Sequence, residues 1–301
     1  ECDGGGAVNG RPLPMRVPQY EEDWHRPERA VREGDHRLRL TWEVPASCNM
    51  RPLCPYCNNA ASRAQQPALP PGFAAIVDGL ARLGEERGPL YLSVCYGEPL
   101  SHQSVIDAIG RLGRRNLVDV STNLLATPDV ASNWPRNGNI RLVTSWHPHR
   151  WPLSHLLDRR REWERAGIAC GLVTVVAWPP YLPGLHRSVM MLRALGVDVE
   201  VLPFHGEWAG AVYPAAYTDW ERAAVEGLVS LRHQGAVWQP GRLCRAGHSY
   251  AFVRFDGIVQ RCYVYGSAVL GDVRQHVRLL DSPAQCESPS CPCPDMWQML
   301  D

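Results

Sequence analysis

The sequence predicts an α/β fold built on a parallel sheet, because short β-like runs alternate with amphipathic helical stretches from Arg37 onward. Six apolar runs rich in β-branched residues are the expected strands: Leu38–Val44, Leu90–Cys95, Leu117–Ser121, Ile140–Ser145, Cys170–Val176 and Val197–Leu202. Six strand–helix units form either an open sheet or a partial barrel. In both arrangements the functional site lies at the carboxyl ends of the strands.

Segments with the apolar spacing of an α-helix lie between these runs. Apolar residues recur at i, i+3, i+4 and i+7 within Phe73–Leu83 and again within Val105–Leu112. We expect further helices near residues 152–166, 185–195 and 218–232. Thr218 and Glu221 form a capping box at the start of the last one.

Composition changes at both ends of this alternating region. Residues 1–36 are rich in Gly, Pro and charge and predict an irregular arm, whereas residues 235–242 look like a linker. Beyond the linker, Asp256-Gly257 stands between two β-like runs, which is a strong signal for a two-residue hairpin turn. We therefore expect three domains, at residues 1–36, 37–235 and 236–301.

Charge and cysteine usage exclude several classes of protein. Basic and acidic residues balance at 31 each, which argues against a broad basic face for nucleic acid. All of the basic residues are Arg, so a Schiff-base Lys and a phosphate-loop Lys are excluded. No apolar run reaches the roughly 18 residues of a membrane helix. Eleven clustered cysteines without a signal peptide favour metal ligation in a reducing cytoplasm.

The first cysteine cluster follows the first expected strand. Cys48, Cys54 and Cys57 form a C-x5-C-x2-C pattern on one loop. Three thiolates can hold three irons of a cubane cluster and leave the fourth iron open for a ligand. A zinc site that takes a distant fourth ligand is the alternative.

The second cluster lies in the C-terminal region and contains Cys244, Cys262, Cys286, Cys291 and Cys293. The first two flank the expected hairpin, and the other three follow it. An iron–sulfur cluster and a zinc ribbon both fit this pattern.

These patterns together resemble the radical S-adenosylmethionine (AdoMet) superfamily. The family motif C-x3-C-x-aromatic-C keeps its second half here, with Tyr56 as the aromatic residue, while the first gap is two residues longer. The family's Gly-Gly-Glu-Pro motif is present as Tyr96-Gly97-Glu98-Pro99, with Tyr in place of the first Gly. The resemblance implies a partial (β/α)6 TIM-like barrel with a small Cys-rich β-hairpin domain at the C-terminus.

The resemblance also implies the AdoMet-binding residues. Gly97, Glu98 and Pro99 are expected at the methionine amino group, with Glu98 as its salt-bridge partner. Thr122 and Asn123 are expected near the ribose and methionine, and Ser145 at a further AdoMet contact. One electron from a [4Fe–4S] cluster on Cys48, Cys54 and Cys57 would then cleave AdoMet to a 5′-deoxyadenosyl radical.

The C-terminal cysteines resemble the auxiliary-cluster domains called twitch and SPASM. Five cysteines fit the shorter twitch form with one auxiliary [4Fe–4S] cluster, on Cys244, Cys262, Cys291 and Cys293, with Cys286 as the alternate ligand. Such a cluster takes part in electron transfer, substrate binding or sulfur insertion.

Two further residues are candidate catalytic groups. Cys95 ends the second strand and can face the substrate as a hydrogen donor, although a buried inert thiol is the alternative. His147 follows the fourth strand and can act as an acid–base group, although a surface His is the alternative.

We therefore expect a cytoplasmic radical AdoMet oxidoreductase of bacterial specialised metabolism, which abstracts hydrogen from a sugar, aminocyclitol or nucleoside. A flavodoxin or ferredoxin would be its electron donor, and neither nucleic acid nor membrane its partner. The alternatives are a maturase of a ribosomal peptide, sulfur insertion from the auxiliary cluster, and a non-enzymatic zinc module.

Overall fold

The computed structural model describes residues 38–44, 47–50, 52–57, 69–228, 241, 243–263 and 267–286 of the 301-residue chain. The chain divides into two units, residues 1–36 and 37–301, and the fold below is that of the second. The expected N-terminal arm lies outside the described residues, as do Cys291 and Cys293.

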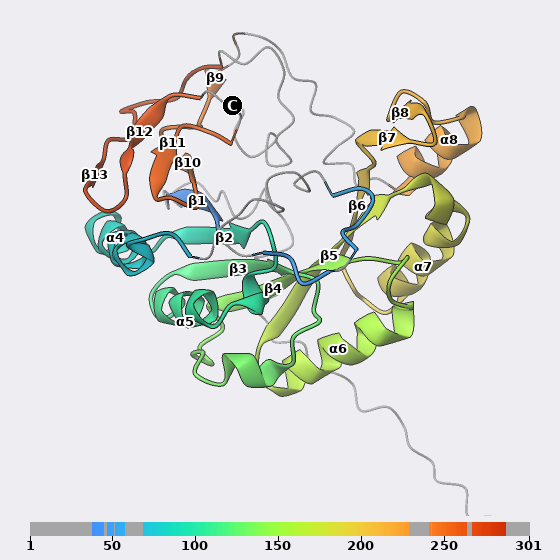
Figure 1. The fold of residues 1–301 in the computed structure, drawn as a ribbon, viewed down its shortest axis with the longest axis horizontal. Helices are drawn as coiled ribbons and strands as arrows, with labels where there is room; N and C mark the ends of the chain where they lie inside the picture. The colour runs from blue at the N-terminus through green and yellow to red at the C-terminus, as the bar shows by residue number, and fades with distance from the viewer. Residues whose placement is uncertain are drawn as a thin grey trace, which may run out of the picture. The chain divides into compact units, whose positions relative to one another are not determined.

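All six expected strands are present and parallel. They are β1 (Arg39–Glu43), β2 (Tyr91–Cys95), β3 (Leu117–Thr122), β4 (Ile140–Trp146), β5 (Ala169–Ala177) and β6 (Val199–Pro203). Each pairs with the next in chain order. Figure 1 shows them as a curved arc, so the parallel sheet is confirmed and takes the form of a partial barrel.

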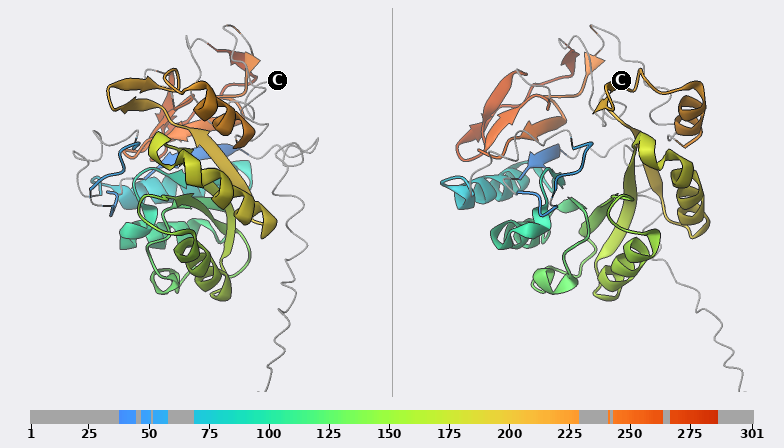
Figure 2. Two further views of the ribbon diagram at one scale, coloured as in Figure 1. Left: turned by 90° about the vertical axis from the view of Figure 1, so that its right-hand side faces the viewer. Right: turned by 45° about the vertical axis from the view of Figure 1, so that its right-hand side comes forward.

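Five α-helices occur where the sequence predicts them. They are α4 (Phe73–Arg87), α5 (Gln103–Leu112), α6 (Leu153–Arg165), α7 (Leu182–Ala194) and α8 (Asp219–Leu228). Helices α4 to α7 lie along the convex side of the arc in all three views (Figures 1 and 2). The other side of the sheet is therefore the concave face.

One of the six expected strand–helix units is wrong. Between β3 and β4 the chain forms only a short 3-10 helix, η2 (Pro128–Ala131), and no α-helix. The segment contains Pro128 and Pro135 together with several Asn residues, and these residue types favour turns over helix interiors.

Four C-terminal strands extend the same sheet: β10 (Tyr250–Val253), β11 (Ile258–Gln260), β12 (Val269–Asp272) and β13 (His276–Val277). Strands β9 (Leu243–Cys244) and β14 (Ala284–Gln285) pair with each other in a separate two-stranded sheet. Strand β10 pairs in parallel with β1, so the sheet order is β13-β12-β11-β10-β1-β2-β3-β4-β5-β6. The chain therefore returns from the β6 edge to lie beside its first strand.

The expected hairpin is confirmed, but its turn is longer than two residues. Strands β10 and β11 are antiparallel, and the Arg254 amide donates to the Ile258 carbonyl at 2.9 Å. Phe255–Gly257 is thus a three-residue loop, closed by a bond from the Gly257 amide to the Arg254 carbonyl at 3.0 Å. Gly257 has φ 89°, as expected of the left-handed residue that ends such a loop.

Side chains on each strand alternate between helices and the concave face. On β1, Trp42 is buried on the helix side and stacks on Phe73 of α4, with ring centroids 6.0 Å apart. On the concave face, Tyr91 donates to Asp119 at 2.5 Å, and Arg141 makes two bonds to the same carboxylate at 2.9 and 2.6 Å. This buried polar row ties β2, β3 and β4 together below the carboxyl ends.

Gly79 provides a test of the packing between α4 and the C-terminal strands. A Cβ atom at Gly79 would stand 2.1 Å from the carbonyl oxygen of Val273, just after β12. Gly79→Ala should therefore destabilise the chain by about 2 kcal/mol or more, as overpacking does. Gly184→Ala in α7 is the control, because its Cβ meets nothing within 4 Å, and it should gain up to about 1 kcal/mol. Urea unfolding measures both, and equal effects would contradict this packing.

Candidate active site

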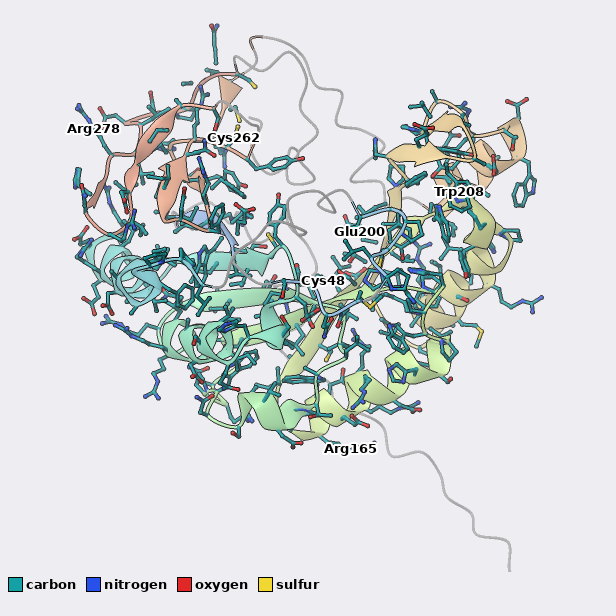
Figure 3. The ribbon with its side chains drawn as sticks, viewed as in Figure 1. Cys48, Arg165, Glu200, Trp208, Cys262 and Arg278 are labelled. Carbon is teal, nitrogen blue, oxygen red and sulfur yellow. The ribbon has the colours of Figure 1, made fainter. Side chains whose placement is uncertain are left out.

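The cysteine loop after β1 lies at the carboxyl ends of the strands. Cys48 and Cys54 are buried, and Cys57 is half-buried. The amide of Cys57 donates to the carbonyl of Cys54 at 3.0 Å, so the second half of the loop is a tight turn. Figure 3 shows Cys48 in the middle of the arc of strands. The loop therefore occupies the expected position for a cofactor site.

Tyr56 fixes the second half of this loop to the end of β4. Its hydroxyl lies 2.9 Å from Nδ1 of His147 and 3.0 Å from Nδ1 of His149. A hydroxyl has one proton, so it donates to one imidazole and accepts from the other, and the two rings differ in protonation at Nδ1. Burial raises the pKa of Tyr56, so the phenol stays protonated.

His147 also reaches the cysteines. Its Nδ1 lies 3.6 Å from Sγ of Cys54, and its ring stacks on Tyr56 with centroids 5.9 Å apart. His147 itself is half-buried. The structure places His147 beside the cysteine loop, where it can orient a thiolate through a hydrogen bond.

Aromatic rings continue from Tyr56 across the end of β5. Trp178 lies 5.7 Å from Tyr56, 5.4 Å from Tyr181 and 4.7 Å from Trp208, measured between ring centroids. Trp208 belongs to a small hairpin of β7 (Gly206–Trp208) and β8 (Ala211–Tyr213) that follows β6. These rings form an apolar wall along one side of the cysteine loop.

Glu98 is the centre of a second group of candidate residues. Its carboxylate is buried and accepts hydrogen bonds from the Leu100 amide at 3.1 Å, the Thr122 hydroxyl at 2.7 Å and the Asn123 amide at 2.7 Å. Three of the expected AdoMet-binding residues thus meet in one hydrogen-bond network. The ends of β2 and β3 are joined by a buried negative charge, which suits an ammonium group nearby.

Two residues of the expected glycine-rich motif adopt left-handed backbone. Tyr96 has φ 70° and Gly97 has φ 60°, and Pro99 then starts the 3-10 helix η1 (Pro99–Ser101). A non-glycine residue in this region costs about 1–2 kcal/mol. Tyr96 replaces the family's Gly despite this cost, and its ring packs edge-on against Phe252 of β10 at 6.0 Å.

The remaining expected residues lie nearby. Ser145 Oγ is 3.4 Å from the Thr174 hydroxyl, and Ser145 and Asn123 line the same small cavity. Cys95 ends β2 and pairs in register with Glu43.

Sequence reasoning missed two acidic residues on these strands. Glu43 accepts from the Phe255 amide at 3.4 Å, and its burial raises the pKa of its carboxyl. Glu200 of β6 pairs in register with Thr174 of β5. The sequence contains a pattern that could have identified Glu200, because a carboxylate between two valines, as in Val199-Glu200-Val201, is unusual in a buried strand.

Three C-terminal cysteines also meet. Cys244 is buried and packs with Tyr250, while Cys262 and Cys286 pack against the same cluster. Burial raises the pKa of Cys244, and the nearby Cys286 and Cys262 raise it further. Strand β14 pairs with β9 and so brings Cys286, the alternate ligand, beside the two cysteines of the hairpin region.

Within the described ranges, no three Cys, His, Asp or Glu side chains are grouped as ligands of a single metal ion. The cysteines of a cubane bind separate irons, so the cluster assignment stays a prediction. No helix in the described part of the chain is long and apolar enough to cross a membrane.

The described chain is thus a partial α/β barrel with a cysteine loop after β1 and three further cysteines packed together near the C-terminal strands. No family model matches the sequence, and no curated protein matches it. Among solved structures, His-tagged anSMEcpe with bound AdoMet is 14% identical with a TM-score of 0.57, and covers 80% of this chain and 79% of its own.

Native anSMEcpe with bound AdoMet and Cp18Cys peptide is 16% identical with a TM-score of 0.55, and covers 79% of this chain and 78% of its own. Both are radical AdoMet enzymes of the SPASM/twitch kind. The resemblance found in the sequence is thus confirmed at the level of the fold.

Tyr96 allows the backbone strain to be separated from the ring contact. Tyr96→Gly removes both, whereas Tyr96→Ala removes the ring and keeps a Cβ at φ 70°. The Gly variant should therefore be more stable than the Ala variant by about 1 kcal/mol. The control is Arg187, an exposed residue in α7. There the Arg187→Ala variant should be more stable than the Arg187→Gly variant by about the same amount, because Ala favours a helix interior over Gly. Chemical denaturation measures the four variants, and an Ala variant at position 96 that matches or exceeds the Gly variant would contradict the strain.

His149 predicts a pH dependence of stability. Burial, with a smaller effect of Arg150, lowers the pKa of His149 from 6.5 to about 4. Between these values the unfolded chain binds the proton and the folded chain does not, so stability falls as the pH falls from 6.5 to 4. The melting temperature of the metal-free chain should fall as the pH is lowered across this window. In His149→Phe the melting temperature should depend less steeply on pH. An identical slope in the variant would contradict the buried neutral imidazole.

Proposed function

We propose that this chain is a radical AdoMet enzyme that acts on a small polar molecule of the sugar, aminocyclitol or nucleoside type. The observation that carries the proposal is the hydrogen-bonded connection between the cysteine loop and the network around Glu98. The backbone amide of Asn123 donates to Glu98, and the side-chain amide of Asn123 donates to Asn49 in the cysteine loop at 2.7 Å. The expected cluster loop and the expected AdoMet residues are thus one connected unit.

The cysteine loop fits a cubane cluster by the chemistry of its donors. Cys48 Sγ accepts from the Met50 amide at 3.5 Å, and Cys54 Sγ contacts His147, so two thiolates have groups that stabilise negative charge. Cys48, Cys54 and Cys57 would hold the cluster, which supplies the electron for AdoMet cleavage. Tyr56 and Trp178 cover one side of the loop and exclude water.

The network around Glu98 would bind AdoMet. The Glu98 carboxylate attracts the ammonium group, and Thr122 and Asn123 keep the carboxylate in place. Ser145 adds a hydroxyl at the end of β4. These groups orient the bound molecule and do not react themselves.

The acidic residues on the strands support a small polar substrate. Glu43 and Glu200 offer acceptors for hydroxyl or ammonium groups, and Cys95 stands in register beside Glu43. The thiol of Cys95 would donate a hydrogen atom to a substrate radical or line the substrate pocket without reacting.

The second cysteine group would hold an auxiliary [4Fe–4S] cluster. Cys244, Cys262 and Cys286 supply three ligands because they already pack together, and Cys291 or Cys293 supplies the fourth. The role of this site is electron transfer or substrate binding. A flavodoxin or ferredoxin would deliver electrons to the enzyme.

Iron and labile sulfide per chain test this proposal. After anaerobic reconstitution the wild type should hold about eight irons, and a Cys48/Cys54/Cys57→Ala variant about four. Cys170→Ala is the control and should keep the wild-type value, because burial raises the pKa of this thiol to about 12 and keeps it protonated. A colourless wild-type chain, or zinc in place of iron, would refute the proposal.

A further inference from the structure

The gap between Cys48 and Cys54 is two residues longer than in the family motif, and the structure shows how the longer segment is held. Asn49 Oδ1 accepts from the side-chain amide of Asn123 at 2.7 Å. The carbonyl of Pro52 accepts from the guanidinium of Arg150. The lengthened half of the loop is therefore tied at two points, to the end of β3 and to the segment after β4.

Both ties start from side chains that are themselves fixed. Asn123 accepts from the Leu125 amide at 3.0 Å, so its amide group has a defined orientation toward Asn49. The backbone amide of Arg150 donates to the His147 carbonyl at 2.8 Å, which closes the turn after β4. The acceptors of both ties, Asn49 and Pro52, lie inside the longer gap.

Met50 and Leu53 anchor the segment to the hydrophobic core, whereas Asn49 and Pro52 are exposed and are held by hydrogen bonds. Met50 is buried and its amide donates to Cys48 Sγ. A loop with two extra residues has more conformations to lose when it is ordered. Fixed hydrogen bonds at Asn49 and Pro52 restrict those conformations and hence the distance between Cys48 and Cys54.

We propose that Asn49 and Arg150 are positioning residues for the cysteine loop, which hold Cys48 in register with Cys54 and Cys57 despite the longer gap. This inference rests on the proposed function, because it assumes that the three thiols share one cluster. Asn49 acts through its side-chain oxygen, and Arg150 acts through a charged donor to a backbone carbonyl. Without either tie, Cys48 leaves its iron more often and the cluster is lost faster.

The test follows loss of the loop cluster from the full reconstituted chain in the presence of an iron chelator. The readout is the part of the reduced EPR signal that changes on addition of AdoMet, since only a cluster with an open iron responds. Asn49→Ala and Arg150→Ala should lose this signal roughly tenfold faster than wild type, as expected for the loss of one hydrogen bond.

Matched variants separate positioning from general damage. Asn49→Asp keeps an acceptor oxygen and should lose the signal at the wild-type rate, with a shifted EPR spectrum from the added charge. Asn133→Ala and Arg161→Ala remove an exposed amide and an exposed guanidinium that donate to Asp107 and Asp158, outside the loop, and should match wild type. Asn49→Leu and Arg150→Met replace the Ala variants where those do not fold.

Two results would overturn the inference: wild-type rates in both tie-removing variants, or equally fast loss in Asn49→Asp and Asn49→Ala. Failure of the proposed function is seen separately and earlier, because wild type itself would then show no AdoMet-sensitive iron signal.

Discussion

The buried carboxylate of Glu98 is the interaction on which the candidate site depends. It is 2% exposed, and its oxygens accept from groups at the ends of two neighbouring strands. A buried charge is tolerated only when donors surround it, so Glu98 fixes the relative positions of those strand ends. The side chain of Asn123 then donates a hydrogen bond to Asn49 and so fixes the cysteine loop relative to these strand ends. The same carboxylate thereby connects the candidate AdoMet residues with the cysteine loop.

The return of the chain to β1 is the second constraint. Because β10 pairs with β1, the β10–β11 hairpin that leads to Cys262 lies on the sheet that carries the first cysteine loop, and Cys244 and Cys286 pack with Cys262 from the separate β9–β14 pair. Ring contacts from Tyr96 to Phe252 and from Phe252 to Tyr263 connect the glycine-rich turn to the residue after Cys262. The strained backbone of Tyr96 places its ring against Phe252. Tyr in place of the family's Gly therefore adds a contact between the glycine-rich turn and β10.

The sequence predicts the strands, helices and their order well, because apolar periodicity is local information. The family resemblance picks out Glu98, Thr122 and Asn123, and because parallel strands end at one edge their side chains are expected to lie close together. It does not predict the pairing of β10 with β1, which joins residues about two hundred positions apart, nor the contact of Asn49 with Asn123. The place of Cys286 beside Cys244 depends on the pairing of two short strands, which carry too little pattern to be recognised.

Reductive cleavage of AdoMet is the most direct measurement. The reconstituted chain, reduced with dithionite and given AdoMet without a substrate, should release 5′-deoxyadenosine and methionine in equal amounts. Glu98→Gln should release much less, because an amide cannot replace a carboxylate that accepts three hydrogen bonds and that, in the proposed function, attracts the ammonium group of AdoMet. Iron-loaded wild-type protein that leaves AdoMet intact would contradict the assignment of this site.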